Sequence, residues 1–169
     1  MMEFAYDRNA AVQYARQWAH GRNPDYYDFE DLGGDCTNFA SQCVLSGAHV
    51  MNHTPDFGWY YYDLNNRAPA WTSVLSLYQF ITQNKGPGPF GAEASLEEAR
   101  EGDLVQLKLD EPVFQHTPVI VSIQKSGASH ANPLDGILVA AHSIDSSDRP
   151  LSTYDIHGLR FIHIEGGRK

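Results

Sequence analysis

The order of local patterns along this chain is the feature that most constrains its fold. Apolar residues recur at helical spacing before Gly102, and short β-type runs separated by polar or Gly/Pro loops come after it. Parallel α/β folds alternate strands with helices along the chain, so this order argues against them. The sequence predicts an α+β fold in which N-terminal helices pack on an antiparallel sheet.

Apolar side chains at helical spacing predict three helices in the first part of the chain. The expected ranges are Ala11–Trp18, Asp35–Ser46 and Trp71–Thr82. Asp7 is the expected N-cap of the first helix, and Gly47 is expected to stop the second. Ser95 with Glu98 forms a capping-box pattern that predicts one further short helix. The expected buried face of the third helix consists of Trp71, Val74, Leu75, Tyr78 and Ile81.

Four segments after Gly102 have the composition of strands. They are Asp103–Leu109, Thr117–Gln124, Ile137–His142 and Leu159–Ile164. The second and third of these are expected to form a hairpin. The Gly/Pro-rich segment Lys85–Pro89 and the acidic, aromatic segment Asn23–Gly34 are expected to be turns or loops.

Length and composition limit the class of protein. The 169 residues fit a single domain over residues 1–169, and a hydrophobic content of 42% supplies a core. A net charge of −9 argues against a nucleic-acid partner, because phosphate binding needs a basic surface. No run approaches the roughly 20 apolar residues of a membrane span, and the first residues lack an export-signal pattern. The sequence leaves the compartment and the oligomeric state open.

The two cysteines, Cys36 and Cys43, are expected to be unpaired. Seven residues apart on one helix, they would be separated by roughly 10 Å, which is beyond disulfide reach. Cys36 follows Gly33-Gly34-Asp35, so Asp35 can cap a helix whose first turn favours an anion at Cys36. This position predicts a nucleophile, although free cysteines are also common core residues. Cys43 lies on the apolar stripe and is expected to be packing.

A catalytic thiol needs a base, and His116 is the expected one among eight histidines. It directly precedes the apolar run Thr117–Val121, so its ring is held at the start of a buried strand. A helix terminus shifts a thiol pKa by less than about one unit, so a nearby imidazolium is expected to supply most of the thiolate stabilisation. The histidines expected in loops or at helix ends are His20, His49, His53, His130 and His157.

The third polar residue of such a site depends on how the strands of the hairpin pair. In an even register His142 shares a face with His116, at about 5 Å. In an odd register Asp145 takes that place instead. The sequence leaves both registers open, and a structural histidine pair is the alternative to a catalytic one. No metal-ligand spacing and no phosphate-binding glycine loop is present, so neither a metal nor a cofactor is expected.

Nearly the whole chain is covered by a series of short motifs: Tyr6–Ala15, Asn23-Pro24, Asp35–Gln42, Gly58-Trp59, Gly102-Asp103, Gln115–Thr117 and Ala141–Ser143. This series resembles the putative amidase domain family of bacteria (the type 6 amidase domain), a branch of the papain-like NlpC/P60 superfamily. The Asp-Cys-Thr-Asn-Phe core of the third motif is the specific part. The resemblance implies a papain-like, NlpC/P60-type fold with Cys36 as nucleophile and His116 as base. It also implies that His142 orients His116.

The resemblance also bears on the oxyanion hole and on substrate contacts. Papain-type enzymes place a glutamine at the sixth position before the nucleophile, and Glu30 stands there in this chain. A carboxylate would repel an oxyanion, so the backbone N–H of Cys36 is the expected donor. Tyr26 or Tyr27 is the expected second donor by analogy with NlpC/P60 relatives. Trp59, in an aromatic-rich segment, is expected to offer its ring to a sugar or peptide.

Together these residues predict a cysteine-dependent amide-bond hydrolase that works through a thioester intermediate. The resemblance implies a peptide or peptidoglycan substrate from the bacterial cell wall. Two alternatives remain at this level. One is a catalytically silent papain-like binding domain that keeps the fold and an aromatic groove. The other is a cysteine amidase or acyltransferase that acts on a different amide.

Overall fold

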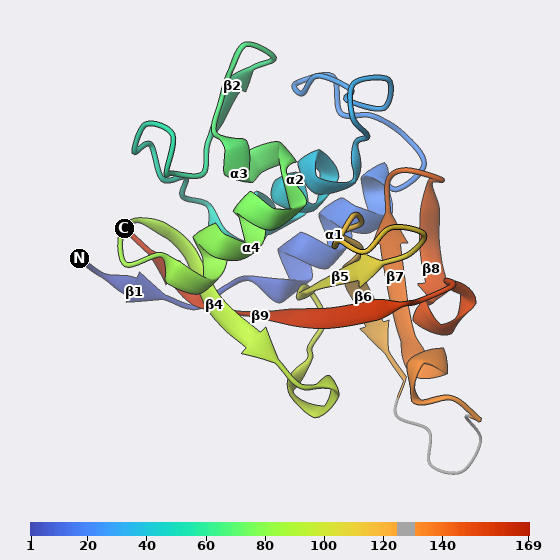
Figure 1. The fold of residues 1–169 in the computed structure, drawn as a ribbon. Helices are drawn as coiled ribbons and strands as arrows, with labels where there is room; N and C mark the ends of the chain where they lie inside the picture. The colour runs from blue at the N-terminus through green and yellow to red at the C-terminus, as the bar shows by residue number, and fades with distance from the viewer. Residues whose placement is uncertain (125–130) are drawn as a thin grey trace.

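The computed structural model describes residues 1–124 and 131–169, and its architecture is mixed α+β (Figure 1). The helices are α1 (Arg8–Trp18), α2 (Cys36–Ala48), α3 (Pro69–Thr72) and α4 (Val74–Gln83). Short 3-10 turns are η1 (Leu96–Glu98), η2 (Pro133–Gly136) and η3 (Leu151–Thr153). The strands are β1 (Glu3–Phe4), β2 (Tyr61–Asp63), β3 (Asn66–Arg67), β4 (Gly88–Ala94), β5 (Leu104–Lys108), β6 (Val119–Ile123), β7 (Ile137–Ala141), β8 (Ser146–Pro150) and β9 (Gly158–Arg168).

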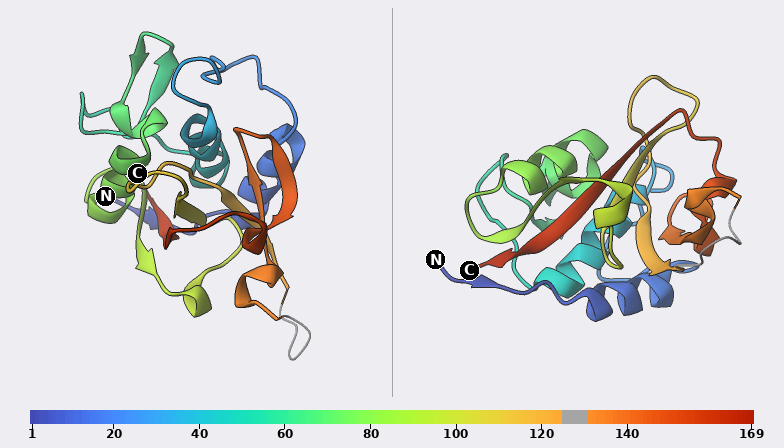
Figure 2. Two further views of the ribbon diagram at one scale, coloured as in Figure 1. Left: turned by 45° about the vertical axis from the view of Figure 1, so that its right-hand side comes forward. Right: turned by 90° about the horizontal axis from the view of Figure 1, so that it is seen from below.

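The main sheet is antiparallel and follows the order β1-β9-β5-β6-β7-β8, with β4 on the other side of β9. The sheet curls: in Figure 1 β9 runs horizontally, whereas β7 and β8 run nearly vertically, and Figure 2 shows the same twist. Helices α1, α2 and α4 lie on one side of β9 (Figure 1). The predicted α+β fold with an antiparallel sheet is therefore confirmed.

All four expected strands are present, as β5, β6, β7 and β9. The sequence patterns missed β1, β4 and β8 of the main sheet and the separate two-stranded sheet of β2 and β3. Gly88 and Pro89 were expected in a loop, yet they begin β4 and pair with Arg168 and Gly167 of β9. Proline is compatible with this position because β4 pairs with β9 alone and so is an edge strand.

Helix α1 begins as expected, since Asp7 Oδ1 accepts a hydrogen bond from the Ala10 N–H at 3.0 Å. Helix α2 does not stop at Gly47 but continues to Ala48 and ends at His49, whose φ is 61°. Gly47 instead lies against the residues that lead into α1. A Cβ there would lie 2.4 Å from the Tyr6 ring and 2.7 Å from the Asp7 carbonyl oxygen.

The expected third helix is two helices, because Ser73 is extended and caps α4 through its side chain. The break changes the phase of the buried face. Trp71 and Ile81 are buried as expected, but Leu75 is 56% exposed. Leu77 and Phe80 take its place against the core.

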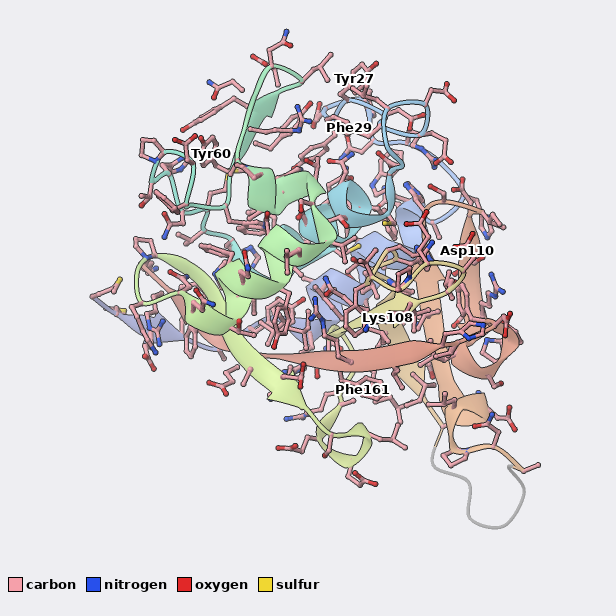
Figure 3. The ribbon with its side chains drawn as sticks, in the orientation of Figure 1. Tyr27, Phe29, Tyr60, Lys108, Asp110 and Phe161 are labelled. Atoms are coloured by element: carbon pink, nitrogen blue, oxygen red, sulfur yellow. The ribbon has the colours of Figure 1, made fainter. Side chains whose placement is uncertain are left out.

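The sheet separates two apolar clusters because successive side chains of a strand point to opposite faces. Leu104 of β5 and Ile162 of β9 face the cluster beneath the helices. Their neighbours Val105 and Phe161 (Figure 3) face a second cluster, closed by Leu151 of η3. None of the helices in residues 1–124 and 131–169 has the length and apolar run needed to cross a membrane.

Candidate active site

The start of α2 is built by a sharp turn in the loop before it. Gly33 and Gly34 both have positive φ, 87° and 94°, which side chains with a Cβ rarely adopt. The turn brings Asp35 to the N-cap position and makes Cys36 the first residue of the helix. The predicted placement of Cys36 in the first turn is therefore confirmed.

Asp35 does not cap the helix with its side chain, contrary to the prediction. Its carboxylate oxygen Oδ1 accepts from the Phe29 N–H at 2.8 Å and from Asn38 Nδ2 at 2.9 Å. The second oxygen, Oδ2, lies 2.6 Å from Nδ1 of His142. The buried carboxylate therefore joins the preceding loop, the first turn of α2 and the end of β7.

Cys36 and His116 are each followed by a threonine, and these two threonines hold the elements together. The Thr37 and Thr117 hydroxyls are hydrogen bonded at 3.2 Å. Beside them the Cys36 thiol points to the carbonyl oxygen of Gln115, 3.9 Å away. The start of α2 is thereby fixed against the segment that precedes β6.

His116 is 7% exposed and lies on an isolated bridge with Leu107. Its ring packs at 5.5 Å, centroid to centroid, against the ring of Tyr154. Burial, reinforced by the charge of Arg149, lowers the pKa of His116 from 6.5 to about 4. At neutral pH the imidazole is therefore uncharged and available as a proton acceptor.

Burial also raises the pKa of the Cys36 thiol above its ordinary 9.0, although hydrogen bonds from Thr37 and the Thr117 backbone oppose this. Both groups are consequently neutral at rest. The sequence had suggested an imidazolium that stabilises a thiolate. The structure favours a neutral thiol and imidazole instead, because desolvation penalises both charged forms.

Cys36 and His116 line one open pocket of about 460 Å³. Gly33, Gly34 and Ser143 form part of its wall, and Asp110 comes from the loop after β5 (Figure 3). Arg149 and Tyr154, from β8 and the turn after η3, complete the part nearest His116. The sequence patterns did not single out these two residues, since neither belongs to a recognisable motif.

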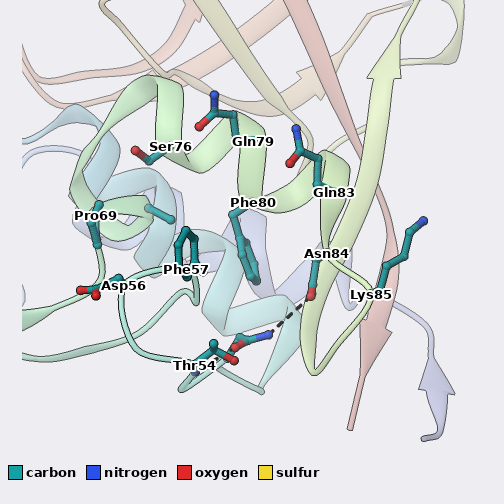
Figure 4. Close-up of a pocket in the computed structure, with 12 residues that line it drawn as sticks. Thr54, Asp56, Phe57, Pro69, Ser76, Gln79, Phe80, Gln83, Asn84 and Lys85 are labelled. Atoms are coloured by element: carbon teal, nitrogen blue, oxygen red, sulfur yellow. Dashed lines mark hydrogen bonds between the residues drawn. The ribbon is translucent and has the colours of Figure 1, made fainter.

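A larger hollow of about 680 Å³ lies elsewhere, between α4 and the loop that carries Thr54, Asp56 and Phe57 (Figure 4). Among the described residues, neither cysteine and no histidine lines it. Although this hollow is larger, its described lining therefore offers no cysteine–histidine pair. The smaller pocket is therefore the candidate active site.

His142 does not lie against the His116 ring, contrary to the prediction. The strands pair in an odd register at this end, since Val119 lies opposite Ala140, whereas beyond a bulge Ser122 lies opposite Leu138. Both ring nitrogens of His142 have other neighbours: Asp35 Oδ2 at 2.6 Å, the Trp18 carbonyl oxygen at 2.8 Å and Arg22 Nη1 at 3.0 Å. His142 therefore meets the start of α2 through Asp35 and through Phe39, on which its ring stacks at 4.1 Å.

Asp145, the alternative third residue, is also engaged elsewhere. Its two carboxylate oxygens accept from Arg22 at 2.9 and 3.1 Å. Glu30 also pairs with Arg22, at 3.4 Å, and does not line the pocket. Among residues 1–124 and 131–169, no side chain or backbone group hydrogen bonds to the His116 ring, which packs against the Tyr154 ring.

The predicted aromatic contacts lie away from the pocket. Trp59 is 0% exposed and donates to Ser41 Oγ, so it is a core residue rather than a substrate platform. Tyr26 stacks on Trp71 at 5.9 Å, and burial raises the pKa of its hydroxyl. Tyr27 is 42% exposed and packs edge-on against Phe29 (Figure 3). Neither tyrosine is among the residues that line the pocket.

Apart from His116, none of the histidines in residues 1–124 and 131–169 lines the pocket. His53 stacks with Tyr62 on the surface, and His157 is exposed beside Asp155. His163 binds the buried Asp103 at 2.8 Å. His130 lies outside the described residues. In the part of the chain that the structure describes, no three His, Cys, Asp or Glu side chains group as a metal site would require.

A family model described as "Putative amidase domain" matches residues 5–164 of this chain. The uncharacterized protein YhbB of Bacillus subtilis (strain 168) is 32% identical over 132 residues. The matched part covers 76% of this chain and 41% of the relative, so the chain spans about two-fifths of that protein's length. No solved structure matches the chain. The NlpC/P60-type, papain-like detail of the fold therefore stays a prediction.

Proposed function

Since this chain belongs to the putative amidase domain family, we propose that it hydrolyses amide bonds, with Cys36 as nucleophile and His116 as general base. One observation carries the proposal: a thiol at a helix start and a neutral imidazole line the same open pocket. Nucleophilic catalysis by cysteine needs this combination of a thiol and a nearby proton acceptor. The catalytically silent alternative gives no reason for the two groups to share a pocket.

In the proposed reaction the Cys36 sulfur attacks the carbonyl carbon while His116 accepts the thiol proton. The Cys36 backbone N–H, at the start of α2, donates to the developing oxyanion. His116 then gives its proton to the leaving amine, and a thioester remains on Cys36. Water, deprotonated by His116, attacks the thioester and releases the acid.

The proposed substrate is a peptide of the bacterial cell wall. The motif resemblance to NlpC/P60 enzymes supports this substrate. The openness of the pocket to solvent is compatible with a polymer chain that passes across Cys36. The test is the release of new amino groups from purified cell wall, followed with an amine-reactive dye. If no amino groups are released from cell wall or from simple peptide amides, the proposal is wrong.

Selective labelling tests the nucleophile independently of any substrate. Iodoacetamide is expected to modify Cys36 much faster than Cys43, because Cys36 lines the pocket and Cys43 is 0% exposed. Peptide mass mapping at successive times measures both rates. Circular dichroism confirms that the protein stays folded. Equal labelling of the two cysteines would contradict the assignment.

The pH dependence of kcat/KM is expected to be unusually broad. In the active state the Cys36 thiol keeps its proton and His116 is unprotonated. The thiol loses its proton above its raised pKa, and His116 gains a proton below its pKa of about 4. The two limits belong to the pair as a whole. We expect a plateau from about pH 5 to about pH 9, measured in constant-ionic-strength buffers. An acid limb near 6.5, the value of a solvated histidine, would show that His116 is not the base in its buried state.

A further inference from the structure

Arg149 is held rigidly in the wall of the candidate active site. Its Nε donates to Thr153 Oγ1 at 2.7 Å, and its Nη2 donates to the Thr153 carbonyl oxygen at 3.2 Å. Its guanidinium carbon lies 3.6 Å from the centre of the Tyr154 ring, which in turn packs against His116. Three contacts therefore fix the plane of the guanidinium before any ligand arrives.

The charge of Arg149 has no acidic partner among residues 1–124 and 131–169. Four other arginines in the described chain do form ion pairs with carboxylates: Arg8, Arg16, Arg22 and Arg168. A guanidinium has five N–H donors, and the two bonds to Thr153 leave enough of them for a ligand. In a chain of net charge −9, a fixed, unpaired arginine beside the reactive residues is a site for an anion.

We propose that Arg149 binds a carboxylate, and that the substrates of this site carry a free carboxylate close to the scissile amide. The planar fork of a guanidinium matches the two oxygens of a carboxylate, which gives orientation as well as affinity. Asp110 and Asp155 line the same pocket, so a monoanion is favoured over a phosphate dianion. That the bound carboxylate belongs to a substrate rests on the proposed amidase function, whereas carboxylate binding itself does not.

Binding a carboxylate at Arg149 also changes the base. The charge of Arg149 is one of the causes that lower the pKa of His116. A carboxylate seated on the guanidinium offsets that charge, so the imidazolium formed during attack becomes easier to reach. Recognition and proton transfer are then coupled through one side chain.

Pairs of alkylating agents that differ only in charge test this proposal on Cys36. The pairs are iodoacetate with iodoacetamide, and N-iodoacetylglycine with its amide, which place the carboxylate at two distances from the sulfur. In Arg149→Gln the ratio of the carboxylate rate to the neutral rate should fall about tenfold or more, the effect of one charge-assisted contact. A change in the fraction of Cys36 thiolate affects both reagents of a pair equally, so it cancels in the ratio of their rates. Arg149→Lys should recover part of the loss.

Arg160→Gln is the matched control. The Arg160 guanidinium also stacks at 3.6 Å on a tyrosine, Tyr78, but it does not line the pocket. If Arg160→Gln lowers the ratio as much as Arg149→Gln, or if neither lowers it, the proposal is overturned. The unaltered protein gives a second measurement that does not depend on a variant. N-acetylglycine should slow iodoacetamide labelling of Cys36, N-acetylglycinamide should not, and equal effects would also overturn the proposal.

The two proposals fail in different ways. Normal alkylation with a charge-dependent ratio, but no amide hydrolysis, would leave Arg149 as a carboxylate site and remove the amidase function. Amide hydrolysis with equal rates on carboxylate and amide forms of one peptide would retain the function and remove the role of Arg149.

Discussion

Replacing Cys36 with alanine is expected to lower kcat/KM for amide hydrolysis by at least about a thousandfold, since no thioester can form. The measurement is the release of amines from the best substrate found, with the protein shown to be folded. Cys36→Ser tests the same point more gently, because a hydroxyl is a far weaker nucleophile at the same position. Residual hydrolysis at even a tenth of the original rate would show that another group attacks the carbonyl.

Cys43→Ser is the matched control, one cysteine later on the same helix. Cys43 is 0% exposed, so serine would bury a hydroxyl without an assured partner, at a cost of about 1–3 kcal/mol. Cys36→Ser should change the free energy of unfolding much less. Urea titrations of the two variants measure this difference. The opposite order of stabilities would show that the burial of the two thiols has been assigned the wrong way round.

His142→Ala should destabilise the fold by about 3–5 kcal/mol, the effect of removing one partner from a buried polar pair. The side chains of His142 and Asp35 are 2% and 1% exposed, and the Asp35 carboxylate would lose its 2.6 Å contact. The ring also stacks on Phe39 at 4.1 Å, so a cavity forms beside α2 as well. Urea denaturation followed by far-UV circular dichroism measures the loss.

Asp145→Ala is the control for this variant. Asp145 also contacts Arg22, but its side chain is 29% exposed, so the change should be within about 1 kcal/mol. Equal destabilisation of the two variants would mean that the His142–Asp35 contact contributes little to the fold. Because Asp35 directly precedes Cys36, a loss of activity in His142→Ala is expected to follow from disorder at the start of α2. It should therefore be partly restored in His142→Gln, which keeps a donor toward Asp35.

The elements that could be predicted are those whose pattern is local. The period of Ala11 to Trp18 and the Asp7 cap predicted α1, and the apolar runs after Gly102 predicted β5, β6, β7 and β9. The break at Ser73 and the passage of α2 through Gly47 depend on what packs against each helix. Such tertiary contacts leave no periodic trace in the residues themselves.

The candidate site was only partly predictable for the same reason. Cys36 and His116 lie in short motifs, and each is followed by a threonine. The hydroxyls of these two threonines form a hydrogen bond in the structure. The register of β6 and β7 decides where His142 points, and register is set by the whole sheet. Arg149 and Tyr154 reach the pocket from β8 and the segment after η3, far along the chain from Cys36. The residues next to them in the sequence form no motif that predicts a place in the site.

The neutral resting state of Cys36 has a consequence for its survival in oxidising surroundings. Peroxide attacks the thiolate rather than the thiol, so a thiol whose pKa is raised by burial forms sulfenic acid slowly. Most cysteine nucleophiles gain reactivity from a permanent thiolate and are exposed to this damage between turnovers. Here the ionised sulfur would exist only briefly, while a substrate occupies the pocket and His116 holds the proton.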